Sequence, residues 1–288
     1  MRFNLYKDVK DFYTDTYNIM MRNEAQNLIP LGNLIMGNEG KDKTDWRDPA
    51  FWFMAAVSDK DEILLTALMT PPFNLTLYAT DNKINSDAIS CLINGIAQTE
   101  NKIPGVMTEN ILAEYFAGAY AKANNIQFKI KSKMRIHELI RVNPDIPKNG
   151  ALRLARESDI PFLPYWLESF NFDCFGTALN INQDPEFYRY HIKGHKIYIL
   201  EENGVPVSMA QKSREMQTVC GVSYVYTPPY FRGKGYATSC VAAVSRLILE
   251  AGFKKCVLYT DLANPVSNSI YKKIGYSPIC DSLEIKFE

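Results

Sequence analysis

The stretch Arg232-Gly233-Lys234-Gly235-Tyr236-Ala237 decides how the second half of this chain folds. It follows an apolar run at 222–226 and the breaker Pro228-Pro229, and it precedes a segment of helical periodicity. A strand, a glycine-rich turn and a helix start make a site for an anion. Glycines let the backbone approach a ligand, and the first N–H groups of a helix have no intrahelical partner. With the charges of Arg232 and Lys234 added, the stretch predicts binding of a phosphorylated ligand.

Two well-known phosphate motifs do not fit this turn. The P-loop pattern is absent because Lys234 lies between the glycines, and the dinucleotide pattern fails because Thr238 occupies the place of its third glycine. Taken alone, the turn is also compatible with an ordinary strand-to-helix connection, in which the glycines supply geometry only.

The elements around the turn follow from periodicity. Apolar residues from Ala237 to Ala251 recur at steps of four and three, which predicts a helix that Gly252 ends. Asn203-Gly204 predicts the turn of a hairpin. By the same reasoning we expect strands at 151–156, 197–200, 205–210, 219–226, 255–260 and 283–287, and helices at 161–169, from Asp184-Pro185 onward, and at 264–274.

The first half repeats this order more faintly. We expect a helix at 9–28, a polar loop at 37–48, a hairpin at 52–57 and 63–69, then strand 75–79, helix 86–97, strand 103–107, helix 111–123 and strand 127–131. The turn formers of 143–150 suggest a linker. The sequence therefore predicts an α/β (α+β) chain of two similar domains, at 1–145 and 151–288. Residues 80–85, after the strand at 75–79, contain no glycine, so a phosphate site is not expected there.

Composition excludes several classes of partner. The 288 residues suit two ordinary domains, and 32 basic residues balance 32 acidic ones, so no nucleic-acid partner is indicated. No apolar stretch approaches the ~20 residues of a membrane-spanning helix, and the first residues lack the apolar core of a signal peptide. We therefore expect a cytoplasmic protein. Six cysteines without a C-x-x-C pair, and three histidines without ligand spacing, predict reduced thiols and no metal.

A second motif lies some thirty residues after the turn. Asn264 precedes Tyr271 by seven residues, and Gly275-Tyr276 follows. Together the two stretches resemble the GCN5-related N-acetyltransferase (GNAT) superfamily over residues 151–288. The acetyl-CoA loop of that family, [QR]-x-x-G-x-[GA], is matched by Arg232, Gly235 and Ala237. The resemblance implies tandem GNAT-like domains, each with a mixed, mostly antiparallel twisted sheet flanked by helices, the first being a degenerate copy without the loop.

The resemblance also implies roles for individual residues. Acetyl-CoA would be the co-substrate, with its pantetheine arm along the main chain of Val225 and Thr227 and its pyrophosphate on the backbone of 232–238. An N–H near Val225 or Tyr226 would stabilise the oxyanion, and Tyr271 would be the general acid. The full set of expected cofactor-binding residues is Val225, Tyr226, Thr227, Arg232, Gly233, Lys234, Gly235, Tyr236, Ala237, Thr238, Asn264 and Asn268.

Several of these residues have a simpler explanation. Asn264 before Pro265 is also a good helix cap, and Tyr271 is also a candidate for an amphipathic core position. Glu168 and Asp173 lie near the expected acceptor-side helices, yet neither stands out as a general base. The aromatic residues of this region suit a core or an acceptor site, and they are Phe162, Tyr165, Trp166, Phe170 and Phe172.

The function implied is transfer of an acetyl group to a primary amine of a small molecule or peptide. Two alternatives stay open: another acyl or aminoacyl transfer on the same scaffold, or a non-catalytic CoA-binding module. The intact stretch from Arg232 to Ala237 favours a CoA donor over a charged tRNA, and the pairing of Asn264 with Tyr271 favours an enzyme. The acceptor and the oligomeric state are not indicated.

Overall fold

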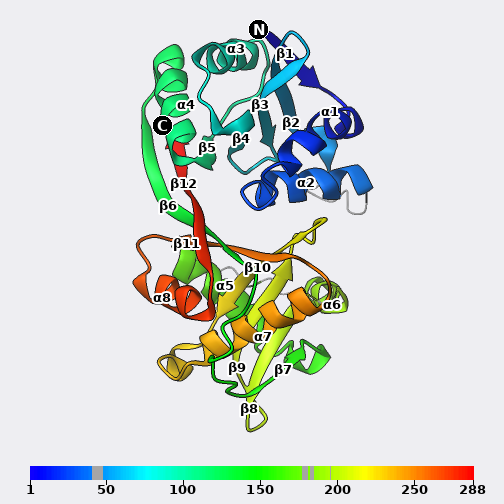
Figure 1. The fold of residues 1–288 in the computed structure, drawn as a ribbon, viewed down its shortest axis with the longest axis vertical. Helices are drawn as coiled ribbons and strands as arrows, with labels where there is room; N and C mark the ends of the chain where they lie inside the picture. The colour runs from blue at the N-terminus through cyan, green and yellow to red at the C-terminus, as the bar shows by residue number, and fades with distance from the viewer. Residues whose placement is uncertain (41–47, 177–180, 182–184, 195) are drawn as a thin grey trace. The chain divides into compact units, whose positions relative to one another are not determined.

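The computed structural model describes residues 1–40, 48–176, 181, 185–194 and 196–288. The chain divides into two compact units, Met1–Ile136 with Ile279–Glu288, and His137–Pro278. Each unit has strands and flanking helices of its own (Figure 1). The boundary between the units falls within strand β6 (Phe128–Leu139) and within β12 (Ser277–Phe287).

In the first unit the strands lie in the order β1, β2, β3, β4, β5, β12, β6. Neighbours from β1 to β4 are antiparallel, whereas β5 is parallel to β4 and antiparallel to β12. These strands are β1 (Arg2–Tyr6), β2 (Phe53–Asp59), β3 (Glu62–Met69), β4 (Leu75–Ala79) and β5 (Gly105–Glu109). The flanking helices are α1 (Val9–Met21), α2 (Leu28–Glu39), α3 (Ser86–Ile96) and α4 (Asn110–Asn124).

Both faces of the β2 strand are covered. Its first six residues are all buried. Phe53 and Val57 join a core cluster with α3 residues such as Leu92, and α1 also contacts this strand. The sequence of a strand that is covered on both faces is continuously apolar, because apolar and polar residues alternate only where one face of a strand meets water.

The second unit has the strand order β6, β11, β10, β9, β8, β7. Neighbours from β7 to β10 are antiparallel, and β11 runs parallel to β10. The strands are β7 (Ala151–Leu154), β8 (Ile197–Glu202), β9 (Val205–Ser213), β10 (Val219–Tyr226) and β11 (Lys255–Asp261). The helices are α5 (Leu163–Phe175), α6 (Pro185–Lys193), α7 (Tyr236–Glu250) and α8 (Pro265–Ile274).

Two apolar clusters lie on opposite faces of this second sheet. Successive β8 residues show the alternation: Leu200 packs in the cluster of α7 and α8, and Ile199 packs in the cluster that contains Leu163 of α5. Figure 1 shows α7 crossing the strands of this unit. The predicted hairpin turn is confirmed, with Asn203 at φ 52° and Gly204 at φ 76°, the left-handed pair that a type I′ turn requires.

The predicted element order is confirmed in both units. A hairpin, a strand, a helix, a strand, a helix and a strand follow one another as β2–β3, β4, α3, β5, α4, β6, and again as β8–β9, β10, α7, β11, α8, β12. The mixed and mostly antiparallel sheets flanked by helices are those of the predicted α/β class.

Some boundaries in the first half were wrong. The helix expected at 9–28 is two helices, because α1 ends at Met21 and α2 begins at Leu28. Pro30 is compatible with α2 because a proline in the first helical turn removes no intrahelical hydrogen bond. The loop expected at 37–48 is helical up to Glu39, and strand β1 was not predicted. The expected helix start at Asp184 lies outside the described residues.

The ends of the second half also differ from expectation. Residues 279–288 belong to the first unit, where β12 pairs with β5 from Ser282 to Lys286. The alternation of β12 marks a half-exposed strand but does not say which sheet edge it joins. The expected linker belongs to the second unit, because the Asn143 N–H donates to the carbonyl of Ile274 at 2.8 Å and the Asn149 N–H donates to Ser239 Oγ at 3.3 Å.

Candidate active site

The glycine-rich turn presents bare backbone at the start of α7. Gly233 has φ 77° and Gly235 has φ 82°, in the left-handed region that residues with a Cβ rarely adopt. Gly235 is the N-cap of α7, and no side chain accepts a hydrogen bond from the first turn of this helix. The first N–H groups of α7 are therefore open to an anion, and the helix dipole favours one there.

The N-terminus of the corresponding helix in the first unit, α3, is capped by a neighbouring side chain. The Asn85 side chain accepts from the N–H groups of Asp87 and Ala88, at 3.1 and 3.0 Å, at the start of α3. A capping side chain occupies the position that a phosphate would take. This geometry supports the expectation that the segment after β4 holds no phosphate.

The basic side chains of the turn are already engaged. Arg232 forms an ion pair with Asp173 of α5 at 2.6 Å, and its Nε donates to the carbonyl of Thr227 at 2.9 Å. Its guanidinium also lies 5.7 Å from the centre of the Tyr226 ring. Lys234 Nζ lies 4.8 Å from the centre of the exposed Tyr230 ring. A phosphate at this turn would therefore compete with Asp173 for Arg232.

Strands β10 and β11 separate just before the turn. Their parallel register runs from Val219 with Lys255 to Gly221 with Val257 and then stops. Beyond Ser223, β10 has a bulge against β9, and Tyr224 within it has φ 48°. A bulge leaves an extra residue outside the ladder and turns backbone groups away from the neighbouring strand. The main chain around Val225 is thus placed at the gap.

Helix α8 brings the second motif to the end of β11. Asn264 caps α8 by accepting from the Ser267 N–H at 3.0 Å. Asn268 donates to the carbonyls of Asp261 and Asn264, at 3.0 and 2.8 Å, and accepts from the Thr260 hydroxyl at 2.7 Å. The Asn268 amide therefore fastens β11 to α8. Asn264 keeps its amide nitrogen without a hydrogen-bond partner among the described residues.

Tyr271 lies in the interior of the second unit. Its side chain is 7% exposed and packs in the cluster that contains Cys240 and Tyr276, against which Val225 also rests. Burial raises the pKa of Tyr271 well above its ordinary value, with smaller contributions from Cys174 and Cys240. A raised pKa keeps the hydroxyl protonated at neutral pH, which is the state that a proton donor requires.

The aromatic residues of α5 cover the other face of β10. The ring of Phe170 lies 4.8 Å from that of Tyr224, and the ring of Trp166 lies 6.0 Å from that of Tyr226. Tyr165 and Phe172 are 57% and 53% exposed, so they do not belong to this packing. Of the two interpretations of these aromatic residues, a core or an acceptor site, core packing therefore holds for Trp166 and Phe170. Both also contact the bulged part of β10, next to the gap.

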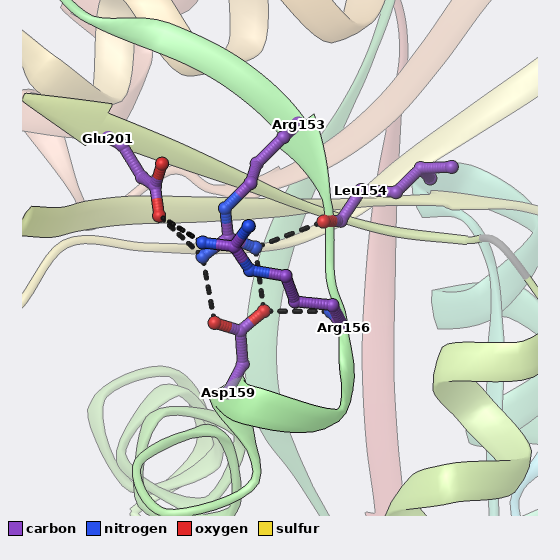
Figure 2. A network of polar contacts seen from close by, with 5 residues as sticks. All are labelled: Arg153, Leu154, Arg156, Asp159 and Glu201. Atoms are coloured by element: carbon purple, nitrogen blue, oxygen red, sulfur yellow. Dashed lines mark hydrogen bonds and ion pairs between the residues drawn. The ribbon is translucent and has the colours of Figure 1, made fainter. Parts of the chain in front are cut away.

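A network of charges fixes the segment before α5 (Figure 2). Arg153 of β7 donates to both carboxylate oxygens of Asp159, at 2.7 and 2.8 Å, and pairs with Glu201 of β8 at 2.6 Å. Asp159 is 2% exposed and also accepts from the Arg156 N–H at 2.8 Å. A bidentate, buried pair holds its geometry well, so the network positions the start of α5 against the sheet.

Sequence reasoning missed two features of the site. The partner of Arg232 and the bulge at Tyr224 depend on residues that are distant along the chain. A positive φ at a tyrosine cannot be predicted from the residue type, in contrast to one at a glycine. Pro228-Pro229 was the available signal that β10 stops at Tyr226.

The described part of the chain holds no group of three or more His, Cys, Asp or Glu residues placed to bind a metal ion. None of its helices is both long and apolar enough to cross a bilayer.

The fold is that of a mixed α/β protein, in which the strand–turn–helix segment before α7 leaves the start of that helix without a side-chain cap. Residues 163–276 match the model of the Acetyltransferase (GNAT) family. An uncharacterized N-acetyltransferase of Escherichia coli, YjgM, is 26% identical over 106 residues. That match covers 36% of this chain and 64% of the relative. Residues 163–276 of this chain are thus similar to the acetyltransferase domain of the GNAT family.

Solved structures with this fold extend over both units. A GNAT-family acetyltransferase from Colwellia psychrerythraea has a TM-score of 0.57 and 10% identity, covering 100% of this chain and 99% of that one. A tandem GNAT protein from the clavulanic acid biosynthesis pathway has a TM-score of 0.58 and 10% identity, covering 100% and 98%. The expected tandem fold is therefore confirmed, since both neighbours align with the whole chain.

Proposed function

We propose that this chain is an acetyl-CoA-dependent N-acetyltransferase that acetylates a primary amine of a small molecule or peptide. Its single active site lies in the second unit, at the gap between β10 and β11. The observation that carries the proposal is the pair of helix starts: that of α7 is uncapped behind two left-handed glycines, whereas Asn85 caps that of α3. Of these two helix starts, only that of α7 leaves its N–H groups open to an anionic cofactor.

The residues take the following parts in binding. The N–H groups of 236–238 hold the pyrophosphate, with Arg232 released from Asp173 and Lys234 beside it. The pantetheine arm pairs with the main chain of Val225 and Thr227 along the free edge of β10. The Asn264 amide nitrogen donates to a carbonyl of the same arm, while Asn268 positions Asn264.

Transfer forms a carbon–nitrogen bond, breaks the carbon–sulfur bond and moves protons to the sulfur and from the nitrogen. The acceptor amine, as a free base, attacks the thioester carbonyl, and a main-chain N–H at Val225 or Tyr226 stabilises the oxyanion. The carbon–sulfur bond then breaks, and the leaving thiolate takes the proton of the Tyr271 hydroxyl. Tyr271 regains a proton from solvent, and the new amide nitrogen loses its extra proton. The products are the acetylated amine and free CoA.

The direct test is a thiol-release assay on the full chain. We expect acetyl-CoA to release CoA thiol in the presence of at least one class in a panel of amines, and mass spectrometry to find that amine heavier by one acetyl group. Thiol release that no amine stimulates, together with tight acetyl-CoA binding, would instead indicate a CoA-binding module without transferase activity.

A further inference from the structure

The end of β10 lies beyond the bulge, where its pairing with β9 is interrupted. The pairing resumes at Tyr226, which lies opposite Met209. Pro228 and Pro229 follow, and a proline has no N–H with which to extend a ladder of hydrogen bonds. The main chain of residues 225–227 (the acyl segment) therefore needs contacts other than sheet pairing to fix its position beside the gap.

Ser208 of β9 supplies two of these contacts. Its side chain is 0% exposed, and its hydroxyl donates to the carbonyl of Tyr226 at 3.1 Å. The same oxygen lies 2.9 Å from the hydroxyl oxygen of Thr227. A serine has one hydroxyl proton, and Ser208 gives it to Tyr226, so Thr227 is the donor in the second bond. Ser208 thus holds two consecutive residues of the acyl segment.

The hydroxyl of Ser208 lies among apolar side chains. Val207, Met209 and Ala210, its neighbours on β9, are all buried. A buried hydroxyl is unfavourable unless it is hydrogen-bonded, and an apolar side chain of similar size would fill the same space without that requirement. What distinguishes Ser208 from these neighbours is therefore its pair of hydrogen bonds to the acyl segment.

A third contact reaches the acyl segment from the glycine-rich turn. Arg232 Nε donates to the carbonyl of Thr227 at 2.9 Å, while Nη2 of the same guanidinium pairs with Asp173 at 2.6 Å. Thr227 is thus held by its hydroxyl on Ser208 and by its carbonyl on Arg232. Because different nitrogens serve the two partners, a phosphate can replace Asp173 without releasing Thr227.

We propose that Ser208 is a positioning residue for acetyl transfer, which holds the acyl segment in the place where its main chain meets the pantetheine arm and the thioester. The inference rests on the proposed transferase function. Strand β10 lies between β9 and β11, so Ser208 holds the segment from the side opposite the gap and acts through Tyr226 and Thr227. An oxyanion donor is effective when it is fixed before the reaction, and these bonds fix it.

Binding measurements separate this role from a general effect on the fold. Acetyl-CoA and ADP are each titrated into the full chain, because ADP carries a pyrophosphate but has no pantetheine arm. We expect Ser208→Ala to raise the Kd of acetyl-CoA about fivefold, as the loss of one hydrogen bond does, and to leave the Kd of ADP unchanged. Arg232→Glu should raise both Kd values.

Ser245→Ala is the matched control. Ser245 of α7 is also 0% exposed, and its hydroxyl lies 2.8 Å from that of Tyr276, which is outside the acyl segment. Its replacement should lower the midpoint of denaturant unfolding to a similar extent as Ser208→Ala and leave both Kd values at the wild-type level. If the two serine variants weaken acetyl-CoA binding alike, Ser208 serves only the fold and the inference is overturned.

Thr227→Val tests the same hydrogen bond from its other side. Thr227 is half-buried, and valine has nearly the same volume, so the variant removes the hydroxyl without leaving a cavity. We expect it to raise the Kd of acetyl-CoA, and the double variant with Ser208→Ala to show less than the product of the two fold-changes, because one bond is shared. Independent effects of the two substitutions would contradict the proposal.

The same variants distinguish failure of this inference from failure of the proposed function. Weaker acetyl-CoA binding in Ser208→Ala, with no acetyl transfer to any amine, supports the role of Ser208 in holding the acyl segment and removes only the transferase activity. In a chain that does transfer acetyl groups, we expect Ser208→Ala to lower kcat as well, because the oxyanion donor shifts. Wild-type Kd and kcat in this variant overturn the role of Ser208 while the transferase function stands.

Discussion

At the scale of single residues, the environment of Tyr271 decides what it can do. Tyr271 follows Asn264 by seven residues in the sequence. The structure shows that its side chain is buried in the same apolar cluster as Cys240. Burial disfavours the phenolate, so its pKa rises and the proton is retained to above about pH 10. The hydroxyl is thereby available to a thiolate throughout the working range of an enzyme.

Tyr271→Phe should lower kcat by about 100-fold, in line with the loss of one general acid, and leave the Kd of acetyl-CoA unchanged. Because the pKa of Tyr271 is raised, the wild-type rate should not fall between pH 7 and about pH 10 on account of this residue. Steady-state rates measured across this pH range give kcat, and a binding titration gives the Kd of acetyl-CoA. An unaltered kcat would remove Tyr271 from the acid role.

The ion pair between Asp173 and Arg232 gives a second expectation at this scale. Both side chains are about half exposed, at 41% and 49%, so the pair contributes little to folding. Asp173→Asn frees Arg232 for a phosphate and should tighten acetyl-CoA binding by a few-fold, about 1 kcal/mol at most. Asp145→Asn, the same change of charge elsewhere in the unit, is the control. Equal effects of the two variants would indicate only a change in net charge.

At the scale of elements, the start of α5 depends on Arg153. Asp159 is buried and holds two hydrogen bonds from this arginine, as Figure 2 shows. This network could not be predicted from local patterns, because its members come from three segments between 153 and 201. Their effect reaches the site through Trp166 and Phe170, which α5 carries to the face of β10.

Arg153→Ala should lower the free energy of unfolding by about 3 kcal/mol, because it leaves a carboxylate buried without its partner. Denaturant unfolding of the full chain measures the change. Arg189→Ala, which removes a partly exposed arginine paired with the exposed Glu157 and Glu186, should change stability little. Similar losses of stability in both variants would mean that the buried, unpaired Asp159 carboxylate is not the cause of the destabilisation.

At the scale of the whole molecule, the elements that depend on local sequence patterns were predicted more completely than the pairing of segments that are distant along the chain. The glycine-rich turn, the helix of α7 and the Asn203-Gly204 hairpin are local, and the structure has all three. The strand β12 is also visible in its alternation, but its pairing with β5 is not, because any exposed sheet edge accepts such a strand. The break between α1 and α2 was missed because both segments are apolar enough to read as one helix.

The same distinction holds for the site. Glycines and a helix cap have local signatures, so residues 232–238 and Asn264 were predicted with their geometry. Asp173 and Tyr224 acquire their significance from tertiary neighbours, which no local pattern records.

The stoichiometry of acetyl-CoA binding to the full chain, measured by titration calorimetry, tests the single active site most directly. We expect one site per chain, with Arg232→Glu raising Kd at least about tenfold through the loss of a charge-assisted phosphate contact. Arg141→Glu, an equal change of charge on the surface of the same unit, should not raise it. Two sites per chain, or wild-type affinity in Arg232→Glu, would contradict the assignment of residues 232–238 as the pyrophosphate turn of a single active site.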